Sequence, residues 1–464
     1  MSATILDAEE ARAALFTPAT VILPPRPLRG FALIAAARRN LLEVIDADLF
    51  ERPYRESRNF GRAYLGVCSP ELIQSVLLDE ADAFQRAESQ QRLFRPAVGE
   101  GLFTAEGAAW RRQRRAAAPA FRHEFLRNMV SAFAEAAEDA AERLVASRRS
   151  GPVDVEPEMR RATLSVVSRT LLAGFDNAAD PQRLTQRLGA FAALVAKPTL
   201  LDLIGAPAWI PSVARLRLQR VARAMREEAR HALERRRADG QEGDLLGALV
   251  AARDPETGAG LTDAELVDNI LTFVGAGHET STVALTWALG LIARAPAVQQ
   301  RLADEAHAVL GAGPVTADAV DRLRFHEQVL NETLRLFTPT PFLLRQAHRD
   351  VDLGPVRVRA GTEVWCHLYV LHRSPLQWDA PAAFDPDRFS PERSRGRHRF
   401  GFIPFGAGPR ICIGARFAML EAKTMLATLT RAFHLAPAGP EPLPAFRLTV
   451  RPAGGMWLTL APRA

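Results

Sequence analysis

Hydrophobic residues recur at helical spacing over most of the 464-residue chain. An amphipathic helix has apolar positions three or four residues apart, and this period predicts helices over 124–148, 209–237, 261–292 and 415–433. In the first of these, apolar residues stand four positions apart at Phe125, Met129, Phe133 and Ala137. The pattern predicts a mainly α protein.

Strand-like alternation is confined to two late stretches. Residues 356–364 alternate around a turn at Ala360 and Gly361, and residues 446–450 face 456–460 across a turn rich in Pro and Gly. We therefore expect small β-sheets attached to a helical body.

An apolar connection between two predicted helices has two possible roles. Residues 197–211 contain Pro198, Pro207 and Pro211 among leucines and a tryptophan. Such a loop is either a lid over a pocket or a packed connection, and the sequence leaves both open.

The composition bounds the class of protein. Hydrophobic residues make up 48% and charged residues 24%, and no Gly/Ser linker divides the chain, so we expect one domain over 1–464 with a lead segment at 1–25. Only Lys197 and Lys423 are lysines, so 57 of the 59 basic residues are arginines, and the net charge is +6. Without a polybasic tail, nucleic-acid binding is not expected.

The cysteines and the N-terminal region indicate the setting. Cys68, Cys366 and Cys412 form neither a CxxC pair nor an even disulfide set, which favours a reducing, cytoplasmic location. The uninterrupted apolar run at 31–37 is far shorter than the ~20 residues of a membrane span. We expect no membrane span and no signal peptide.

The strongest chemical signal is the segment 405–414, which reads FGAGPRICIG and precedes a predicted helix. Glycines and a proline around one cysteine describe a tight loop that aims a sulfur atom. A helix N-terminus supplies partial positive charge and free N–H groups, which favour a thiolate. Cys412 is therefore a candidate metal ligand, whereas Cys68 and Cys366 are ordinary small buried residues.

Further charged and hydroxyl residues recur in patterned segments. Glu332 and Arg335 share one helix face, as do Trp110 and Arg114, and the mid-helix segment 276–281 reads AGHETS. Taken singly, each has an ordinary explanation, such as a surface ion pair or a threonine that bonds back to a backbone carbonyl.

Together these motifs resemble the cytochrome P450 family, whose patterns FxxGxRxCxG, ExxR, PxRF and WxxxR are all present in family order. The resemblance implies a P450 fold with haem b between the long central helix and the helix after the cysteine loop. Cys412 would be the axial thiolate ligand of the iron. Phe405 would pack beside the sulfur, Arg410 would pair with a haem propionate, and Gly406 and Gly414 would permit the close turn.

The resemblance also assigns roles to the other motifs. Glu332, Arg335 and Arg388 would form a buried ionic triad that holds the cysteine loop. Ala276 and Gly277 would line an oxygen-binding groove in which Glu279 and Thr280 deliver protons. Trp110, Arg114 and Arg345 would join Arg410 around the two haem carboxylates.

The expected reaction is insertion of one atom of O2 into a lipophilic molecule such as a terpenoid or a fatty acid. The residues placed by resemblance in the substrate pocket are mostly apolar, namely Phe94, Phe273, Val274, Phe342, Leu343 and Met456. The sequence holds no fused reductase, so we expect a monomer that receives electrons from a separate ferredoxin or flavodoxin and its NAD(P)H-dependent reductase.

Two arginine clusters are candidates for docking that electron donor. They comprise Arg111, Arg112, Arg114 and Arg115, and Arg393, Arg395, Arg397 and Arg399. Such a basic surface would attract an acidic protein.

Two other functions fit the same cysteine loop: a haem-binding sensor or carrier, and an isomerase or dehydratase of the same fold. The Glu279-Thr280 pair argues against both, because neither needs a supply of protons.

Overall fold

Helices account for most of the structure, as the periodicity predicts. A computed structural model describes residues 15–59, 61–171, 179–195, 212–240, 243–311 and 313–463. The described helices are α2 (Gly30–Arg39), α3 (Pro70–Gln74), α4 (Glu88–Val98), α5 (Gly107–Ala117), α6 (His123–Arg127), α7 (Val130–Ser147), α8 (Glu156–Leu171), α9 (Ala179–Val195), α11 (Val213–Asp239), α12 (Leu245–Ala251), α13 (Asp263–Ile292), α14 (Pro296–Leu310), α15 (Ala317–Arg322), α16 (Arg324–Leu336), α17 (Leu368–Leu371) and α18 (Ala415–Ala432).

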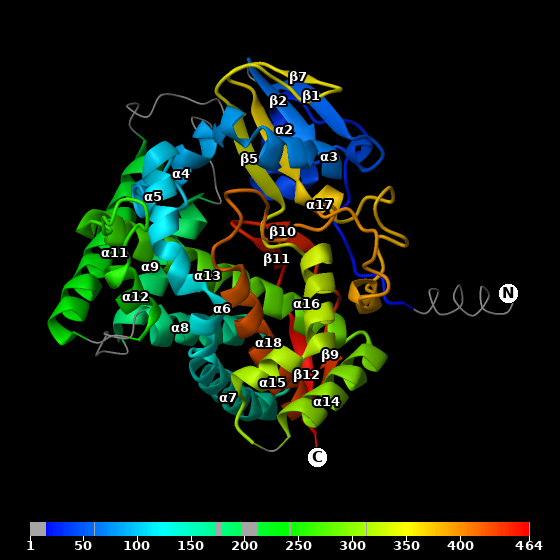
Figure 1. Ribbon diagram of the computed structural model, residues 1–464. Coiled ribbons are helices and arrows are strands. Elements are labelled where there is room, and N and C mark those ends of the chain that lie inside the picture. Colours follow the sequence, from blue (N-terminus) through cyan, green and yellow to red (C-terminus); the bar gives the residue numbers. More distant parts are fainter. Residues whose placement is uncertain are drawn as a thin grey trace, which may run out of the picture.

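The long helix α13 organises the helical part of the molecule. It begins at a capping box, in which the Thr262 side chain and the Glu265 side chain each bond the other residue's backbone N–H. It contacts α8, α11, α16 and α18, and it runs through the middle of the molecule (Figure 1). A helix that is apolar on nearly all sides has to be surrounded in this way.

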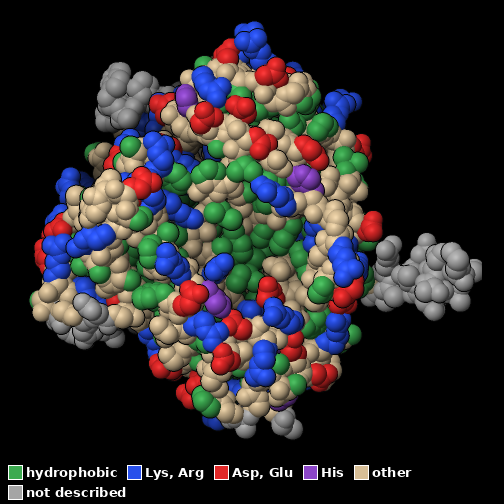
Figure 2. All heavy atoms as spheres, in the orientation of Figure 1, with side chains coloured by type: hydrophobic (Ala, Val, Ile, Leu, Met, Phe, Trp, Pro, Cys, Tyr) green, Lys and Arg blue, Asp and Glu red, His purple; other side chains and the backbone are tan. Residues whose placement is uncertain are grey.

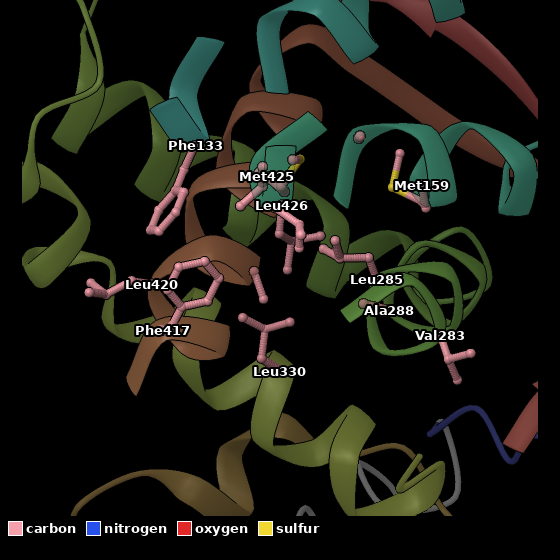
Figure 3. Packing of buried hydrophobic residues seen from close by; sticks show 14 of the residues in the cluster. Phe133, Met159, Val283, Leu285, Ala288, Leu330, Phe417, Leu420, Met425 and Leu426 are labelled. Carbon is pink, nitrogen blue, oxygen red and sulfur yellow. The ribbon is translucent and has the colours of Figure 1, made fainter. Parts of the chain in front are cut away.

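The main core lies where α7, α8, α13, α16 and α18 meet. Figure 3 shows Phe133 of α7, Leu285 of α13 and Leu330 of α16 around Phe417 and Leu426 of α18. The rings of Phe133 and Phe417 meet edge to face at 5.0 Å. This packing fixes α18, and with it the position of the loop that ends at Cys412.

The strands form four small sheets. The largest has the order β1 (Tyr54–Asn59), β2 (Arg62–Val67), β8 (Glu363–His367), β5 (Phe342–Ala347) and β3 (Phe84–Arg86). Only the β2–β8 pair is parallel among these neighbours. The other sheets are β4 (Val153–Asp154) with β12 (Trp457–Pro462) and β9 (Phe433–Pro437), β10 (Pro444–Phe446) with β11 (Val450–Pro452), and β6 (Val351–Asp352) with β7 (Arg357–Val358).

Three predictions from the pattern are wrong in detail. The helix predicted over 124–148 is broken into α6 and α7 around Asn128. The strands on either side of Gly361 belong to different sheets. Residues 446–450 do not pair with 456–460, because Phe446 pairs with Val450 itself.

Asp154 explains the last of these errors. Its Oδ1 accepts the backbone N–H of Met456 at 2.8 Å, and this contact directs the following strand β12 toward β4 and β9. Gly455 lies so close that a Cβ there would meet the Asp154 carboxylate at 2.5 Å. The alternation of apolar and polar residues within one segment cannot predict a contact between residues so far apart in the chain.

The remaining features concern the ends of the chain and its apolar segments. The described part of the predicted lead segment packs on the body, where Phe384 N–H bonds Phe16 O at 2.8 Å. Among the described residues, no single helix passes a length and hydropathy test for a membrane span, and only the pair α13 and α14, bent by 114°, passes it together. The apolar connection at 197–211 lies outside the described residues, so its role as lid or packed loop stays open.

Candidate active site

The cysteine loop is a tight turn whose backbone bonds to itself. Cys412 N–H bonds Phe405 O at 2.9 Å, and Gly406 N–H bonds Ile403 O at 2.9 Å. Gly406 has φ +73°, in the left-handed region that glycine tolerates, which agrees with the close turn that the resemblance implies. Gly414 has φ −87°, so a left-handed backbone does not explain why a glycine stands at this position.

Gly408 is the first fixed glycine of the FxxGxRxCxG pattern, and the sequence alone assigned it no specific role. Its φ is +70°, and a Cβ there would overlap the backbone carbonyl of Leu77 at 1.8 Å. Only glycine lets the loop pass this close to the 75–79 helical segment.

The Cys412 sulfur faces an interior cavity. Cys412 is exposed at the surface of the cavity, yet protein surrounds it closely enough that burial raises the pKa of its thiol. A hydrogen bond from Gly414 and the charge of Arg114 lower that pKa without overcoming burial. The loop and Arg114 therefore favour the thiolate, as expected, but burial outweighs them, and a bound metal cation would stabilise the deprotonated sulfur.

A group of buried arginines stands beside the cysteine on the wall of the same cavity. Arg114, Arg345 and Arg410 all line it, as predicted, and so does Trp110, whose ring lies 4.4 Å from the Arg410 guanidinium. Burial lowers the pKa of Arg410 to about 10 and lowers that of Arg345. Several positive charges buried away from water need negative charges nearby to be stable. One such charge is Glu106, which is paired with Arg410.

Arg86, at the end of β3, belongs to this group although no motif pointed to it. Burial first, and then the charges of Arg345 and Arg410, hold its pKa well below the usual value. Its Nε has no hydrogen-bond partner among the described residues. A buried guanidinium N–H without a partner favours an acceptor group, such as that of an anion, in the cavity.

The middle of α13 brings a hydroxyl and a carboxylate to the cavity. The Thr280 hydroxyl donates to Ala276 O at 2.6 Å, which is the ordinary back-bond of a helical threonine. Ala276, Gly277, Glu279 and Thr280 all line the cavity. Thr280 therefore bonds back to its own helix and also lines the cavity.

Glu279 is buried in a closed ring of four charges rather than facing solvent. Its Oε2 accepts from Arg160 at 3.3 Å and its Oε1 pairs with Arg451, while Glu156 bonds the same two arginines at 2.5 and 3.0 Å. Burial raises the pKa of Glu279, but Arg451 and Arg160 outweigh it, so the pKa lies below the usual value. Glu279 is ionised at neutral pH.

The three predicted members of the ionic triad meet around Glu332 of α16. Arg335 bonds Glu332 through two nitrogens at 2.6 and 2.8 Å, and Arg388 reaches Glu332 Oε1 at 3.3 Å. All three are buried. Arg335 also donates to the carbonyls of His372, Pro381 and Ala383 at 2.7–3.0 Å, so it ties α16 to the segment that precedes the loop.

The cavity has a volume of about 1120 Å³ and walls that are mostly apolar. Phe94, Phe273, Phe342 and Leu343 line it, as predicted, whereas Val274 and Met456 do not. Val274 points into the core, and Met456 packs against Gly290 of α13, where a Cβ would meet its sulfur at 2.3 Å. Figure 2 shows hydrophobic side chains in a hollow at the centre of one face, with charged side chains around the rim.

Glu421 of α18 is a buried carboxyl that belongs to none of the sequence motifs, so the sequence did not predict it as a site residue. The Ser281 hydroxyl donates to Glu421 Oε2 at 2.5 Å, and Oε1 has no partner among the described residues. Burial raises the pKa of Glu421 to about 8, against an opposing effect of the Ser281 bond. Glu421 is therefore mostly protonated at neutral pH.

This raised pKa predicts a pH-dependent stability. The unfolded chain loses the Glu421 proton near the ordinary pKa of 4.5, whereas the folded protein keeps it until about pH 8. Between these values the unfolding free energy falls as pH rises, by at most about 1.4 kcal/mol per pH unit. Glu421→Gln should therefore gain stability relative to the parent protein between pH 5 and pH 8 in urea unfolding, while Glu124→Gln on exposed α6 should not. Equal pH dependence in parent and Glu421→Gln proteins would contradict the assignment.

The fold and this site together define a haem-thiolate protein, and comparisons with known proteins identify the family. The family model described as Cytochrome P450 matches residues 49–458. The chain belongs to the cytochrome P450 family. As a member, it is a monooxygenase that binds haem b, and its mainly α P450 fold agrees with the prediction.

Individual relatives agree. The chain is 34% identical over 444 residues to cyclooctatin synthase of Streptomyces melanosporofaciens, covering 94% of this chain and 92% of that protein. It is 32% identical to a cytokinin hydroxylase of Arabidopsis thaliana, covering 84% and 77%. The crystal structure of the cytochrome P450DA heme domain superposes with a TM-score of 0.81 at 26% identity, covering 97% of this chain and 99% of that one.

Proposed function

We propose that this monooxygenase oxidises a lipophilic small molecule in the cavity above Cys412. One observation carries the proposal: Cys412, Thr280 and a wall of aromatic and aliphatic side chains line one continuous cavity. A pocket of this volume and character is typical of a small-molecule site. A terpenoid or fatty-acid skeleton would bury its apolar surface there.

The residues beside Cys412 fit haem b. Bound haem supplies the iron chemistry that activates O2, and a thiolate ligand favours O–O cleavage. Cys412 would supply the thiolate ligand of the iron, with Phe405, Gly406 and Gly414 shaping its loop. Guanidinium groups suit carboxylates, so Arg86, Arg114, Arg345 and Arg410 would bind the propionates, with Trp110 stacked on Arg410.

Thr280 and Glu279, which line the same cavity from α13, would control protons there. The Thr280 hydroxyl donates its one proton to Ala276 O, so it can accept a hydrogen bond from a water molecule, and it can donate one into the cavity only when the bond to Ala276 breaks. Glu279 is ionised and is paired with Arg160 and Arg451, whose side chains are 30% and 22% exposed against 10% for Glu279, so the ring extends from the cavity toward solvent. Rotation of Glu279 away from one arginine would let it carry a proton inward.

Thr280→Ala is therefore expected to uncouple the reaction. Product formed per NAD(P)H consumed should fall about 10-fold or more while NAD(P)H oxidation continues and hydrogen peroxide accumulates, since general acid–base contributions are about 100-fold or more. Thr272→Ala is the matched control, because Thr272 also lines the cavity from α13 and bonds back to Asp268 O at 2.8 Å. Unchanged coupling in Thr280→Ala would contradict the assigned role, and failure of every apolar candidate to give product would favour a carrier.

We also propose that electrons arrive from a separate ferredoxin or flavodoxin, and that the chain is a single-domain, cytoplasmic monomer. Several arginines of the two predicted docking clusters already contact other side chains of this protein. Arg112 and Arg115 are paired with Glu265 and Asp254, and Arg393 bonds Asp385 at 2.9 Å. Arg114 lines the cavity, and Arg397 stacks on Trp378. Of the eight arginines in the two predicted docking clusters, three are exposed and form no ion pair with a described side chain: Arg111, Arg395 and Arg399.

A further inference from the structure

A second carboxyl lines the same cavity on the wall formed by the large sheet. Glu363 is the first residue of β8, is 7% exposed, and lies beside Tyr64 of β2 and Gln346 of β5 in the strand register. Among the described residues, Glu279 and Glu363 are the carboxyls that line the cavity. The role proposed above uses only the first of them.

The two carboxyls differ in what binds them. Glu279 pairs with two arginines, whereas Glu363 accepts from two neutral donors, the Ser89 hydroxyl at 2.9 Å and the Trp365 indole N–H at 2.8 Å. Burial raises the pKa of Glu363, and these donors and Arg62 lower it without overcoming burial. Two bonds leave lone pairs of the carboxyl unused, so it can accept a further hydrogen bond.

An aromatic wall connects this carboxyl to the middle of the cavity. Alternation along β8 places Glu363 and Trp365 on the same face of the strand. The Trp365 ring lies 5.3 Å from Phe342, and Phe342 lies 6.1 Å from Phe446, all of which line the cavity. A molecule on these rings would bring one end to Glu363.

The neighbouring helix adds a second acceptor. Gln90 follows Ser89 on α4 and lines the cavity, and its buried amide oxygen has no partner among the described residues. Ser89 and Trp365 already donate to Glu363. This end of the cavity therefore offers two acceptors, Glu363 and Gln90, beside the arginines that line it.

We propose that Glu363, supported by Ser89 and Trp365, anchors a hydroxyl group of an otherwise apolar substrate. This deepens the proposed function and rests on its lipophilic substrate. A hydroxyl can donate to Glu363 or Gln90 and accept from a neighbouring arginine, and it carries no charge. A carboxylate cannot donate to Glu363, and an ammonium would meet Arg62, Arg86 and Arg92, which line the cavity from β2, β3 and α4.

The test compares matched ligands on the haem-loaded protein by isothermal titration calorimetry. 1-Decanol can donate a hydrogen bond, whereas 1-methoxydecane can only accept one. The parent protein should bind the alcohol about 10-fold more tightly than the ether, as one hydrogen bond predicts. It should also prefer the alcohol to decylamine and to decanoate.

The variants locate the source of that preference. Glu363→Leu should bind alcohol and ether about equally, and Glu363→Gln, which keeps a weaker acceptor, should retain a preference of about 3-fold. Glu88→Gln is the control for loss of charge, because Glu88 is exposed, neighbours Ser89 and does not line this cavity. If Glu363→Leu does not fold, Glu363→Gln decides alone.

Each outcome has a separate meaning. Equal affinity for alcohol and ether in the parent protein, an undiminished preference in Glu363→Gln, or tighter binding of the amine would overturn the anchor. Oxidised product is assayed independently with the same alcohol. A Glu363-dependent preference without any product would support the anchor and count against the oxidation of lipophilic substrates.

Discussion

Cys412→Ser is expected to abolish oxygenation and to remove the thiolate-type absorption band from the carbon monoxide complex of the reduced protein. A serine oxygen is a harder and far less acidic ligand, so it would not supply the electron density that a thiolate gives to iron. Because the hydroxyl occupies nearly the same volume, the loop bond from residue 412 N–H to Phe405 O should survive. Folding and cavity shape should change little.

Cys68→Ser is the matched control for this substitution. The Cys68 sulfur donates to the carbonyls of Arg52 and Leu49 at 2.8 and 3.0 Å, and burial raises the pKa of its thiol to about 12. A serine can make the same bonds, so spectrum and activity should stay those of the parent. Retention of the thiolate band in Cys412→Ser would refute the assignment of the iron ligand.

Arg335→Leu is expected to destabilise the protein by about 3–5 kcal/mol, which is a large part of the stability of a folded chain. The substitution leaves the Glu332 carboxylate buried with only Arg388 as a charged partner, and it also strands the carbonyls of His372, Pro381 and Ala383. These groups hold the segment that leads to the cysteine loop. Haem loading should therefore fall together with the unfolding free energy, both measured on purified protein.

Arg301→Leu separates burial from ion pairing as such. Arg301 bonds Asp387 through two nitrogens at 2.9 Å each, but the two side chains are 51% and 44% exposed. Loss of this pair should cost no more than about 1 kcal/mol. Similar costs for Arg301→Leu and Arg335→Leu would show that the triad does not act through its burial.

The ionic triad and the arginines show how far local motifs extend. ExxR places Glu332 and Arg335 on one helix face by spacing alone, and Arg388 joins them in the structure as the resemblance implies. Arg86 lies in a short strand with no motif, and its membership depends on β3 pairing with β5 beside Arg345. Arg112, predicted to be a docking residue, is instead paired with Glu265 at the start of α13.

The sequence by itself determined the helical body, the cysteine loop and the family, because these depend on periods and spacings of a few residues along one segment. Only the tertiary structure decided which charges are neutralised, which strands pair, and which side chains reach the cavity. Glu279 acquires its two arginines from α8 and β11, Met456 turns away toward Gly290, and Glu363 reaches the cavity wall across the sheet. Such contacts join residues that are distant in the chain, and their burial changes electrostatic energies in ways that local composition does not record.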